Sequence, residues 1–280
     1  MTVKIVTDAG SDITQEDAKQ LGITVVPTYV RFGDKVYRDG VDISVDEFYR
    51  KLDSGTVYPS TSAQSPGEFA SVYEAALRET NQIVSIHITR KHSAVYDAAR
   101  IGRDMVNKKD CQIEVIDSKG VAMWQGLIVI AAAKAARAGY ELQQVLDVVK
   151  ETIVQIRGLA LLNTLRYAVK GGRLSNTIFA VESLLNVKPM VTIRNGEVSP
   201  AGIARTWNKG MERLYKFIKS INAIEEIAIA HGNAPEEAQK LTAYITSLFP
   251  DIVPRMARLG PTLGSHAGPR TVLVVVHEKK

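Results

Sequence analysis

The sequence is poor in the features that mark secreted and membrane proteins. Cys111 is the single cysteine among 280 residues, so no internal disulfide can form, and its place before an apolar alternation favours a buried thiol at a strand edge over a reactive one. The longest apolar stretch, 121–133, contains Gln125 and falls short of the roughly 20 residues of a membrane span, so it predicts a buried helix. No signal peptide is visible. These absences predict a cytoplasmic protein without a transmembrane segment.

Charge of one sign is not concentrated in any stretch. Lysine and arginine number 35 against 30 aspartates and glutamates, a formal net charge of +5, and no long basic run occurs. Proteins that bind nucleic acid usually carry a basic stripe on one face, so the composition favours no nucleic-acid partner. A small acidic ligand or an acidic partner surface stays compatible with the mild excess of positive charge.

The first half of the chain alternates short apolar runs with helical patterns. Strands are predicted at 3–7, 23–30, 83–89 and 112–117, and helices at 45–52, 69–79, 94–106, 121–138 and 142–156. Alternation of this kind favours a mainly parallel sheet with helices on both faces.

The pattern changes in the second half. Asn195-Gly196 lies between two apolar runs and predicts a hairpin over 188–203, because this dipeptide is the strongest short hairpin signal. Further strands are predicted at 159–165, 227–231, 251–256 and 271–277, and helices at 206–221 and 235–248. We therefore predict an α/β fold of two domains, an N-terminal domain 1–158 and a second α/β domain 159–280.

Four short polar fragments lie where predicted strands give way to loops or helices. They are Ser60-Thr61-Ser62, His92-Ser93, Gly171-Gly172-Arg173-Leu174-Ser175 and Gly264-Ser265-His266-Ala267-Gly268. Hydroxyls, an imidazole and a guanidinium each donate hydrogen bonds to oxygen, so together they suit a small anionic head group without a metal. No complete set of nucleophile, base and orienting residue is visible among them. The chain is therefore interpreted first as a binder of an acidic ligand and second as an enzyme.

Each fragment also has a plainer interpretation. Ser65-Pro66-Gly67-Glu68 predicts a helix start with a capping box, which makes 60–62 a loop whose hydroxyls need not meet a ligand. Ser93 either favours an anion at a helix start or is merely the N-cap. His266 lies in a predicted loop rich in glycine and proline, where it meets either a ligand or solvent. His231 is a weaker candidate of the same kind.

The sequence lacks two common nucleotide-binding motifs, but it offers a pair of carboxylates for a metal-dependent alternative function. The P-loop spacing does not occur, and no Gly-x-Gly-x-x-Gly follows the first predicted strand. Asp8 and Asp12 do follow that strand, and two carboxylates there suit Mg²⁺ in a metal-dependent phosphoryl-transfer enzyme. A phosphatase that forms a phospho-enzyme would place its second acid where Gly10 stands. A turn or capping role for Asp8 therefore competes with the metal role.

Taken in order, the fragments resemble the DegV family of bacterial fatty-acid-binding proteins, the acyl-carrying subunit of fatty acid kinase. The resemblance runs almost from end to end. It includes Val6-Thr7-Asp8 with Ser11-Asp12, Asp39-Gly40-Val41-Asp42, Ser60-Thr61-Ser62 with Ser65-Pro66-Gly67, Ser93, Gly171-Gly172-Arg173-Leu174, Lys188-Pro189, His231-Gly232 and Gly264-Ser265-His266-Ala267-Gly268-Pro269. Each piece is common by itself, but the ordered set is specific.

The resemblance implies that one long-chain fatty acid is buried between the two domains, with its carboxylate near the surface. Thr61, Ser93 and His266 match residues that bind this carboxylate, and Ser62 and Ser265 belong to the supporting head-group loops. The fatty acid is the ligand, and the resemblance implies neither a metal nor a cofactor. Apolar side chains within 159–165 and 179–190 either line the slot for the acyl chain or belong to the core.

The resemblance also implies a partner. Arg173 and Arg205 match positions that dock an ATP-dependent fatty acid kinase. The implied role is a carrier, without catalysis of its own, that presents the carboxylate to this kinase for acyl-phosphate formation in phospholipid synthesis. Transient membrane contact is compatible with such a role.

Overall fold

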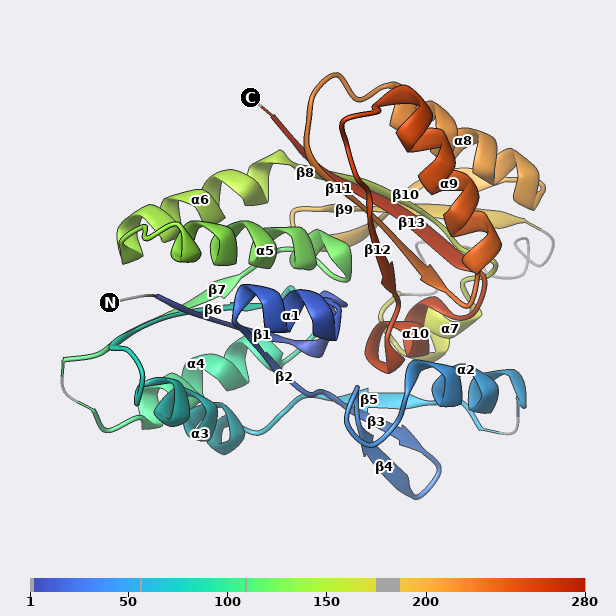
Figure 1. Cartoon of the computed structure of the whole chain (residues 1–280). Coiled ribbons are helices and arrows are strands. Elements are labelled where there is room, and N and C mark those ends of the chain that lie inside the picture. Colours follow the sequence, from blue (N-terminus) through green and yellow to red (C-terminus); the bar gives the residue numbers. More distant parts are fainter. Residues whose placement is uncertain (1–2, 56, 109, 175–186, 280) are drawn as a thin grey trace.

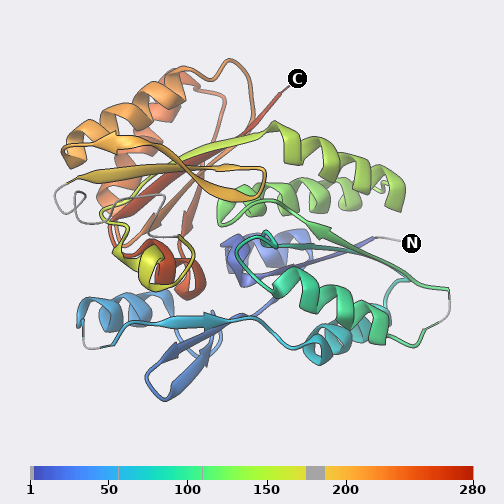
Figure 2. The ribbon, with the colours of Figure 1, turned by 180° about the vertical axis from the view of Figure 1, so that it is seen from behind.

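The computed structural model describes residues 3–55, 57–108, 110–174 and 187–279 of the chain. Helix α5, Met123–Arg137, lies between a four-stranded and a six-stranded sheet and contacts both (Figure 1). Its side chains are buried nearly throughout, which confirms the buried helix predicted from the apolar stretch. Figure 2 shows from behind that α5 and α6, Leu142–Gln155, lie over the four-stranded sheet.

The four-stranded sheet is parallel, as predicted. Its order is β2-β1-β6-β7, and its strands are β1 (Lys4–Asp8), β2 (Ile23–Val26), β6 (Gln82–His87) and β7 (Gln112–Asp117). Helices cover both faces, so the middle of β1 and nearly all of β6 are buried. One face packs on α5 and α6, with α1 (Gln15–Leu21) beside them, and the other on α3 (Pro66–Ala76) and α4 (Val95–Met105).

The six-stranded sheet is antiparallel except for one pair. Its order is β10-β9-β8-β13-β11-β12, with β11 and β12 parallel. The strands are β8 (Ile156–Leu161), β9 (Lys188–Arg194), β10 (Glu197–Ala204), β11 (Ile224–Gly232), β12 (Arg255–Arg258) and β13 (Thr271–Glu278). Helices α8 (Trp207–Lys219) and α9 (Pro235–Leu248) pack on one face. The predicted hairpin is confirmed, with positive φ at both Asn195 and Gly196.

A third, small sheet shows two differences from the sequence predictions. It has the order β4-β3-β5 and consists of β3 (Tyr29–Phe32), β4 (Lys35–Arg38) and β5 (Ser60–Ser62), packed on α2 (Val45–Asp53). The single strand predicted at 23–30 is wrong: it breaks at Pro27, which has no backbone N–H for a sheet ladder, and continues as β3 in another sheet. The loop predicted at 60–62 is also wrong, because these residues pair with β3.

Two short helices complete the structure near the ends of the six-stranded sheet. Helix α7, Arg166–Lys170, follows β8, and helix α10, Pro261–Ala267, stands where a loop was predicted. The loop prediction was wrong although Pro261 at the first turn and Gly268 just beyond the end are signals of a helix. The predicted α/β fold class is confirmed. A domain boundary near residue 158 stays a prediction, and β8, which contains Gly158, already belongs to the six-stranded sheet.

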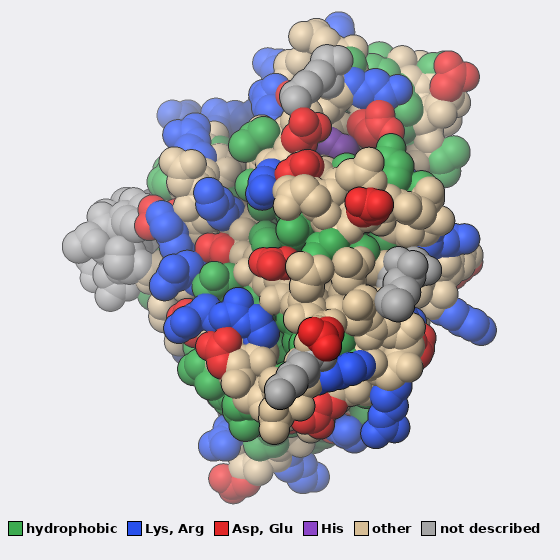
Figure 3. Space-filling view, turned by 90° about the vertical axis from the view of Figure 1, so that its left-hand side faces the viewer, with side chains coloured by type: hydrophobic (Ala, Val, Ile, Leu, Met, Phe, Trp, Pro, Cys, Tyr) green, Lys and Arg blue, Asp and Glu red, His purple; other side chains and the backbone are tan. Residues whose placement is uncertain are grey.

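Surface features agree with the ordinary composition. Lysine and arginine side chains are interspersed with aspartate and glutamate on the face shown in Figure 3. Across the described ranges, no helix is both long and apolar enough to cross a bilayer. Cys111 lies half-buried directly before β7, where its thiol donates to the carbonyl oxygen of Lys108 at 3.1 Å.

Candidate functional site

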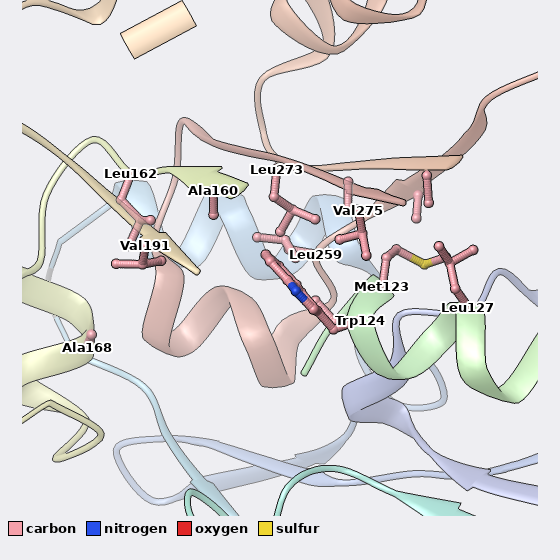
Figure 4. Packing of buried hydrophobic residues seen from close by; sticks show 14 of the residues in the cluster. Met123, Trp124, Leu127, Ala160, Leu162, Ala168, Val191, Leu259, Leu273 and Val275 are labelled. Carbon is pink, nitrogen blue, oxygen red and sulfur yellow. The ribbon is translucent and has the colours of Figure 1, made fainter. Parts of the chain in front are cut away.

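A cavity of about 200 Å³ is lined by residues of all three sheets and of helix α10. Most of its wall is apolar. Many of the apolar side chains belong to the cluster drawn in Figure 4, in which Ala160, Leu162 and Val191 lie on one side of Trp124. Residues of the predicted slot segment 159–165 therefore do line the cavity. Its companion segment lies partly outside the described residues, at 179–186, as does Ser175.

Polar groups enter the cavity from four separate segments of the chain. Thr61 comes from β5, Ser93 precedes α4, Arg173 follows α7, and His266 lies in α10. The four fragments singled out in the sequence therefore meet at one cavity. Each lies at or near an element end, where the chain changes direction and a side chain can point into the space between the sheets.

Thr61 and His266 are joined by a hydrogen bond. Thr61 Oγ1 lies 2.9 Å from Nε2 of the imidazole. Burial lowers the pKa of His266 to about 4, and the positive charge of Arg173 acts in the same direction, so the ring is neutral at neutral pH. A neutral ring protonated at Nε2 donates to Thr61 Oγ1 and leaves the threonine proton free to bind an oxygen in the cavity.

A glycine makes room for this imidazole. Nδ1 of His266 is buried and has no hydrogen-bond partner in the part of the chain that the structure describes. A Cβ atom at Gly171 would lie 2.2 Å from this nitrogen, so any larger residue would displace the ring. Gly171 therefore serves the site through the space that it leaves, whereas Gly172 has a positive φ and no close neighbour at its Cβ position.

Ser93 serves the helix start and faces the cavity at the same time. Its Oγ accepts a hydrogen bond from the backbone N–H of Val95 at 3.3 Å, although the formal N-cap is Ala94. Accepting with its oxygen leaves its own proton free to donate. The neighbouring His92 also lines the cavity, and its Nε2 accepts from the backbone N–H of Val198 at 3.0 Å. Burial lowers the pKa of His92.

Arg173 places a positive charge at the polar end of the cavity. Its Nε donates to the carbonyl oxygen of His92 at 3.3 Å and its Nη1 to that of Gly171 at 2.6 Å. No carboxylate among the residues that the structure describes forms an ion pair with this guanidinium. The charge is therefore available to an anion in the cavity.

The other predicted site residues lie in different surroundings. Ser62 lines the cavity but is largely exposed. Ser265 is buried within α10, where its hydroxyl donates to the carbonyl oxygen of Pro261 at 2.7 Å, and it does not line the cavity. Arg205 is exposed between β10 and α8, away from the cavity lining. His231 lies at a separate hollow, and its Nδ1 accepts from the backbone N–H of Ala234.

Two buried carboxyl groups hold the start of α10. Asp12 Oδ1 accepts from the backbone N–H of Gly260 at 2.8 Å, and Asp39 Oδ2 accepts from that of Thr262 at 2.8 Å. Burial raises the pKa of Asp39 to about 6. Burial also raises the pKa of Asp12 well above its ordinary value, with smaller contributions from the negative charges of Asp39 and Asp8. Sequence reasoning missed this role, because Asp39 is distant in the chain from the helix that it holds.

Asp8 has a capping role, and both of its carboxylate oxygens accept hydrogen bonds from the protein. Its Oδ1 accepts from the backbone N–H of Gly10 at 2.9 Å, and its Oδ2 accepts from His87 Nδ1 and from the side chain of Gln125. Among the described residues, no group of three or more histidine, cysteine, aspartate or glutamate side chains could hold a metal ion. The capping interpretation of Asp8 is confirmed.

Asp8 also completes a buried Ser-His-Asp chain that sequence reasoning missed. Ser85 Oγ lies 2.7 Å from His87 Nε2, and His87 Nδ1 lies 2.9 Å from Asp8 Oδ2. The order of contacts is that of a hydrolase triad, but Ser85 is fully buried, accepts from the hydroxyl of Tyr73 and does not reach the cavity. The chain of bonds therefore ties β1 to β6. Ser85 and His87 stand two residues apart in a strand, which is the signal that could have revealed it.

The whole chain is similar to proteins of one family. The sequence profile of the DegV family matches residues 2–279. The chain belongs to the DegV family. A DegV domain-containing protein of Caldanaerobacter subterraneus subsp. tengcongensis is 35% identical over 99% of both chains.

Solved DegV structures share the fold over their full length. A DegV family protein of Thermus thermophilus, described for its fatty acid binding, has a TM-score of 0.89 at 27% identity, with both chains fully covered. DegV of Bacillus subtilis, a fatty acid binding protein, has a TM-score of 0.90 at 25% identity, also with full coverage. A stearic acid-binding protein of Eubacterium ventriosum has a TM-score of 0.89 at 26% identity over 98% of both chains.

The anchoring of α10 predicts a pH effect on stability. The folded protein holds the Asp39 proton up to about pH 6, whereas the unfolded chain releases it near the ordinary pKa of 3.8. The free energy of unfolding should therefore fall as pH rises between these values, by up to about 3 kcal/mol. Asp39→Asn, which keeps an acceptor for Thr262, should reduce this slope in urea denaturation measured from pH 4 to pH 7. The slope that remains comes from Asp12, whose pKa burial also raises.

Asp46 provides the control for this experiment. Its hydrogen bond with Arg258 lowers its pKa, so it titrates below the tested range. Asp46→Asn should leave the slope of the wild type in place. A slope in Asp39→Asn as steep as in the wild type would show that Asp39 is not the titrating group.

Proposed function

We propose that this DegV protein binds a long-chain fatty acid in the cavity, with the carboxylate at the polar end and the acyl chain along the apolar wall. The observation that carries the proposal is the meeting of Thr61, Ser93, His266 and Arg173 at one end of an otherwise apolar cavity. Solved relatives with the same fold over the full chain are fatty-acid-binding proteins.

The polar end suits a carboxylate. Ser93 accepts a hydrogen bond from the backbone N–H of Val95, and Thr61 accepts one from a His266 ring protonated at Nε2, so each can turn its own proton toward a carboxylate oxygen. Hydrogen bonds to a charged oxygen are shorter and stronger than neutral ones. Arg173 adds a positive charge without occupying both carboxylate oxygens in the described geometry, because two of its N–H groups already bind backbone carbonyls. His266 acts through Thr61, by orienting its hydroxyl.

The apolar wall supplies the binding energy for the tail. Burial of methylene groups contributes roughly 0.8 kcal/mol each before the costs of ordering the chain are subtracted. Ala160, Val191 and Leu273 from three adjacent strands form one part of this wall. This apolar wall makes no polar contact with the carboxylate, so the carboxylate and the acyl chain contribute separately to the binding free energy.

The bound carboxylate is proposed to be the substrate of a separate ATP-dependent fatty acid kinase, which would form the acyl phosphate for phospholipid synthesis. Phosphoryl transfer requires the attacking oxygen and the phosphoryl donor to meet in line, so the kinase has to reach the polar end of the cavity. Arg205 is exposed and is proposed to dock this partner. Arg173 is proposed to serve docking from within the polar end. A cytoplasmic location and transient membrane contact stay predictions.

The head-group assignment predicts a specific loss of affinity. Thr61→Val keeps the shape of the side chain and removes the hydroxyl. The loss of one hydrogen bond to a charged group should cost about 1.5 to 3 kcal/mol, which is about a ten- to hundredfold weaker affinity for oleate. Calorimetric titration of delipidated protein measures this change.

Thr242 offers a matched control, because its hydroxyl bonds within α9, remote from the cavity. Thr242→Val should bind oleate as tightly as the wild type. Organic extraction of purified wild-type protein should release fatty acid detectable by mass spectrometry. An extract without fatty acid, together with no binding of oleate or palmitate by the wild type, would refute the proposed function.

The docking assignment predicts a separation of binding from phosphorylation. Arg205→Ala should bind oleate like the wild type, because the side chain does not line the cavity, but should slow acyl-phosphate formation by the kinase. Arg78→Ala changes an exposed arginine that also lies outside the cavity lining, and should leave both quantities unchanged. Equal rates for the three proteins would remove Arg205 from the docking surface.

A further inference from the structure

Trp124 lines the cavity and lies close to the six-stranded sheet. Ala160 of β8 lines the cavity, and Gly158 stands two residues earlier on the same strand, so a side chain at 158 would point to the same face of the sheet. A Cβ atom there would lie 2.4 Å from the indole. The indole therefore packs against β8 at Gly158. It fills the space beyond Ala160 on this face of the sheet.

Pairing across the sheet shows where the cavity stops. Leu273, Ala160 and Val191 are paired neighbours on three strands and all line the cavity. In the adjacent row, Val275 pairs with Gly158, and Val275 belongs to the core but does not line the cavity. In Figure 4, Trp124 lies between Ala160 and Val191 on one side and Val275 and Met123 on the other.

The polar end lies at the other end of the same strands. Thr271, the first residue of β13, donates to the carbonyl oxygen of Ala267, the last residue of α10, and lines the cavity. Leu273 and Val275 follow along β13 toward Trp124. A chain that enters with its carboxylate at Thr61 and His266 and follows these strands therefore points its methyl end at the indole.

A second hollow lies directly behind this wall. It has a volume of about 340 Å³, and Trp124 and Ile193 line both it and the cavity. The wall between the two spaces is thus one side chain thick. Trp124 is 4% exposed, and its Nε1 has no hydrogen-bond partner among the residues that the structure describes. No described polar contact fixes the indole, so its position depends on packing.

We propose that Trp124, together with Ile193, closes the tail end of the acyl slot and sets the longest acyl chain that the protein accepts. The inference rests on the proposed fatty-acid binding. Interiors are close-packed, so a methylene beyond the end of the slot has to displace the indole. Shorter chains leave the wall in place and gain affinity with each added methylene.

A chain-length series tests the wall directly. In the wild type, affinity for saturated fatty acids should rise about fourfold per methylene up to a maximum and then fall. Trp124→Leu should move this maximum to longer chains, with at least a tenfold gain for acids longer than the wild-type optimum. Gly158→Ala, whose added Cβ pushes the indole off the sheet, should move the maximum to shorter chains.

Trp207 supplies the matched control. It is the second of the two tryptophans and packs with the core on the other face of the six-stranded sheet. Trp207→Leu makes the same chemical change and should leave the maximum unchanged. A wild type that binds no acid of the series would overturn the proposed function. A wild type that binds the series, with an unchanged maximum in a folded Trp124→Leu, would overturn the inference alone.

Tryptophan fluorescence tests whether the methyl end of the fatty acid lies at Trp124, without a substitution of Trp124 or Ile193. In Trp207→Phe, Trp124 is the only tryptophan, so its emission reports on the tail end. A fatty acid brominated next to its methyl end should quench this emission strongly, whereas one brominated next to its carboxyl group should quench it weakly. Equal quenching by the two, or the reverse order, would place the methyl end elsewhere and overturn the inference.

Discussion

The hydrogen bond between Thr61 and His266 joins two segments that lie 205 residues apart, and the polar end of the cavity depends on it. His266 belongs to the seven-residue helix α10, which is too short to be stable by itself. Two aspartates from the N-terminal part of the chain bind its first backbone N–H groups, and the hydroxyl of Tyr49 donates to the carbonyl oxygen of Leu259 just before it. The imidazole is therefore positioned by contacts at the opposite end of its helix.

Burial of these carboxyl groups has a cost in free energy that shows in their raised pKa values. The helix start compensates part of this cost with backbone N–H groups. The buried acidic side chains thus have structural roles. Asp8 caps a turn and links β1 to β6, while Asp12 and Asp39 bind the start of α10. The positive charge at the cavity, from Arg173, has no such carboxylate partner in the described residues. The distribution of charge therefore favours an anionic ligand over a metal ion.

Local patterns were sufficient for the long elements. Strand β7 and helix α9 have the predicted bounds, and the hairpin at Asn195-Gly196 follows from turn chemistry alone. Strand β5 could not be predicted, because Ser60-Thr61-Ser62 has little apolar alternation and becomes a strand only through its pairing with β3. The contact of Asp39 with α10 likewise depends on the folded chain, because Asp39 and Thr262 lie far apart in the sequence.

The site shows the same division. Motif order in the sequence was enough to single out Thr61, Ser93, Arg173 and His266, which the fold brings to one cavity. Trp124 gave no signal, since a tryptophan in a largely apolar helix fits an ordinary core. Only the close approach of its indole to Gly158 in the folded chain shows that it bounds the cavity.

A crystal structure of the protein loaded with oleate tests the central claim most directly. We expect one carboxylate oxygen within about 3 Å of Thr61 Oγ1 or Ser93 Oγ, and the acyl chain between the two sheets with its methyl end at Trp124. Oleate found outside this cavity, or inside it with its carboxylate at the indole, would contradict the claim.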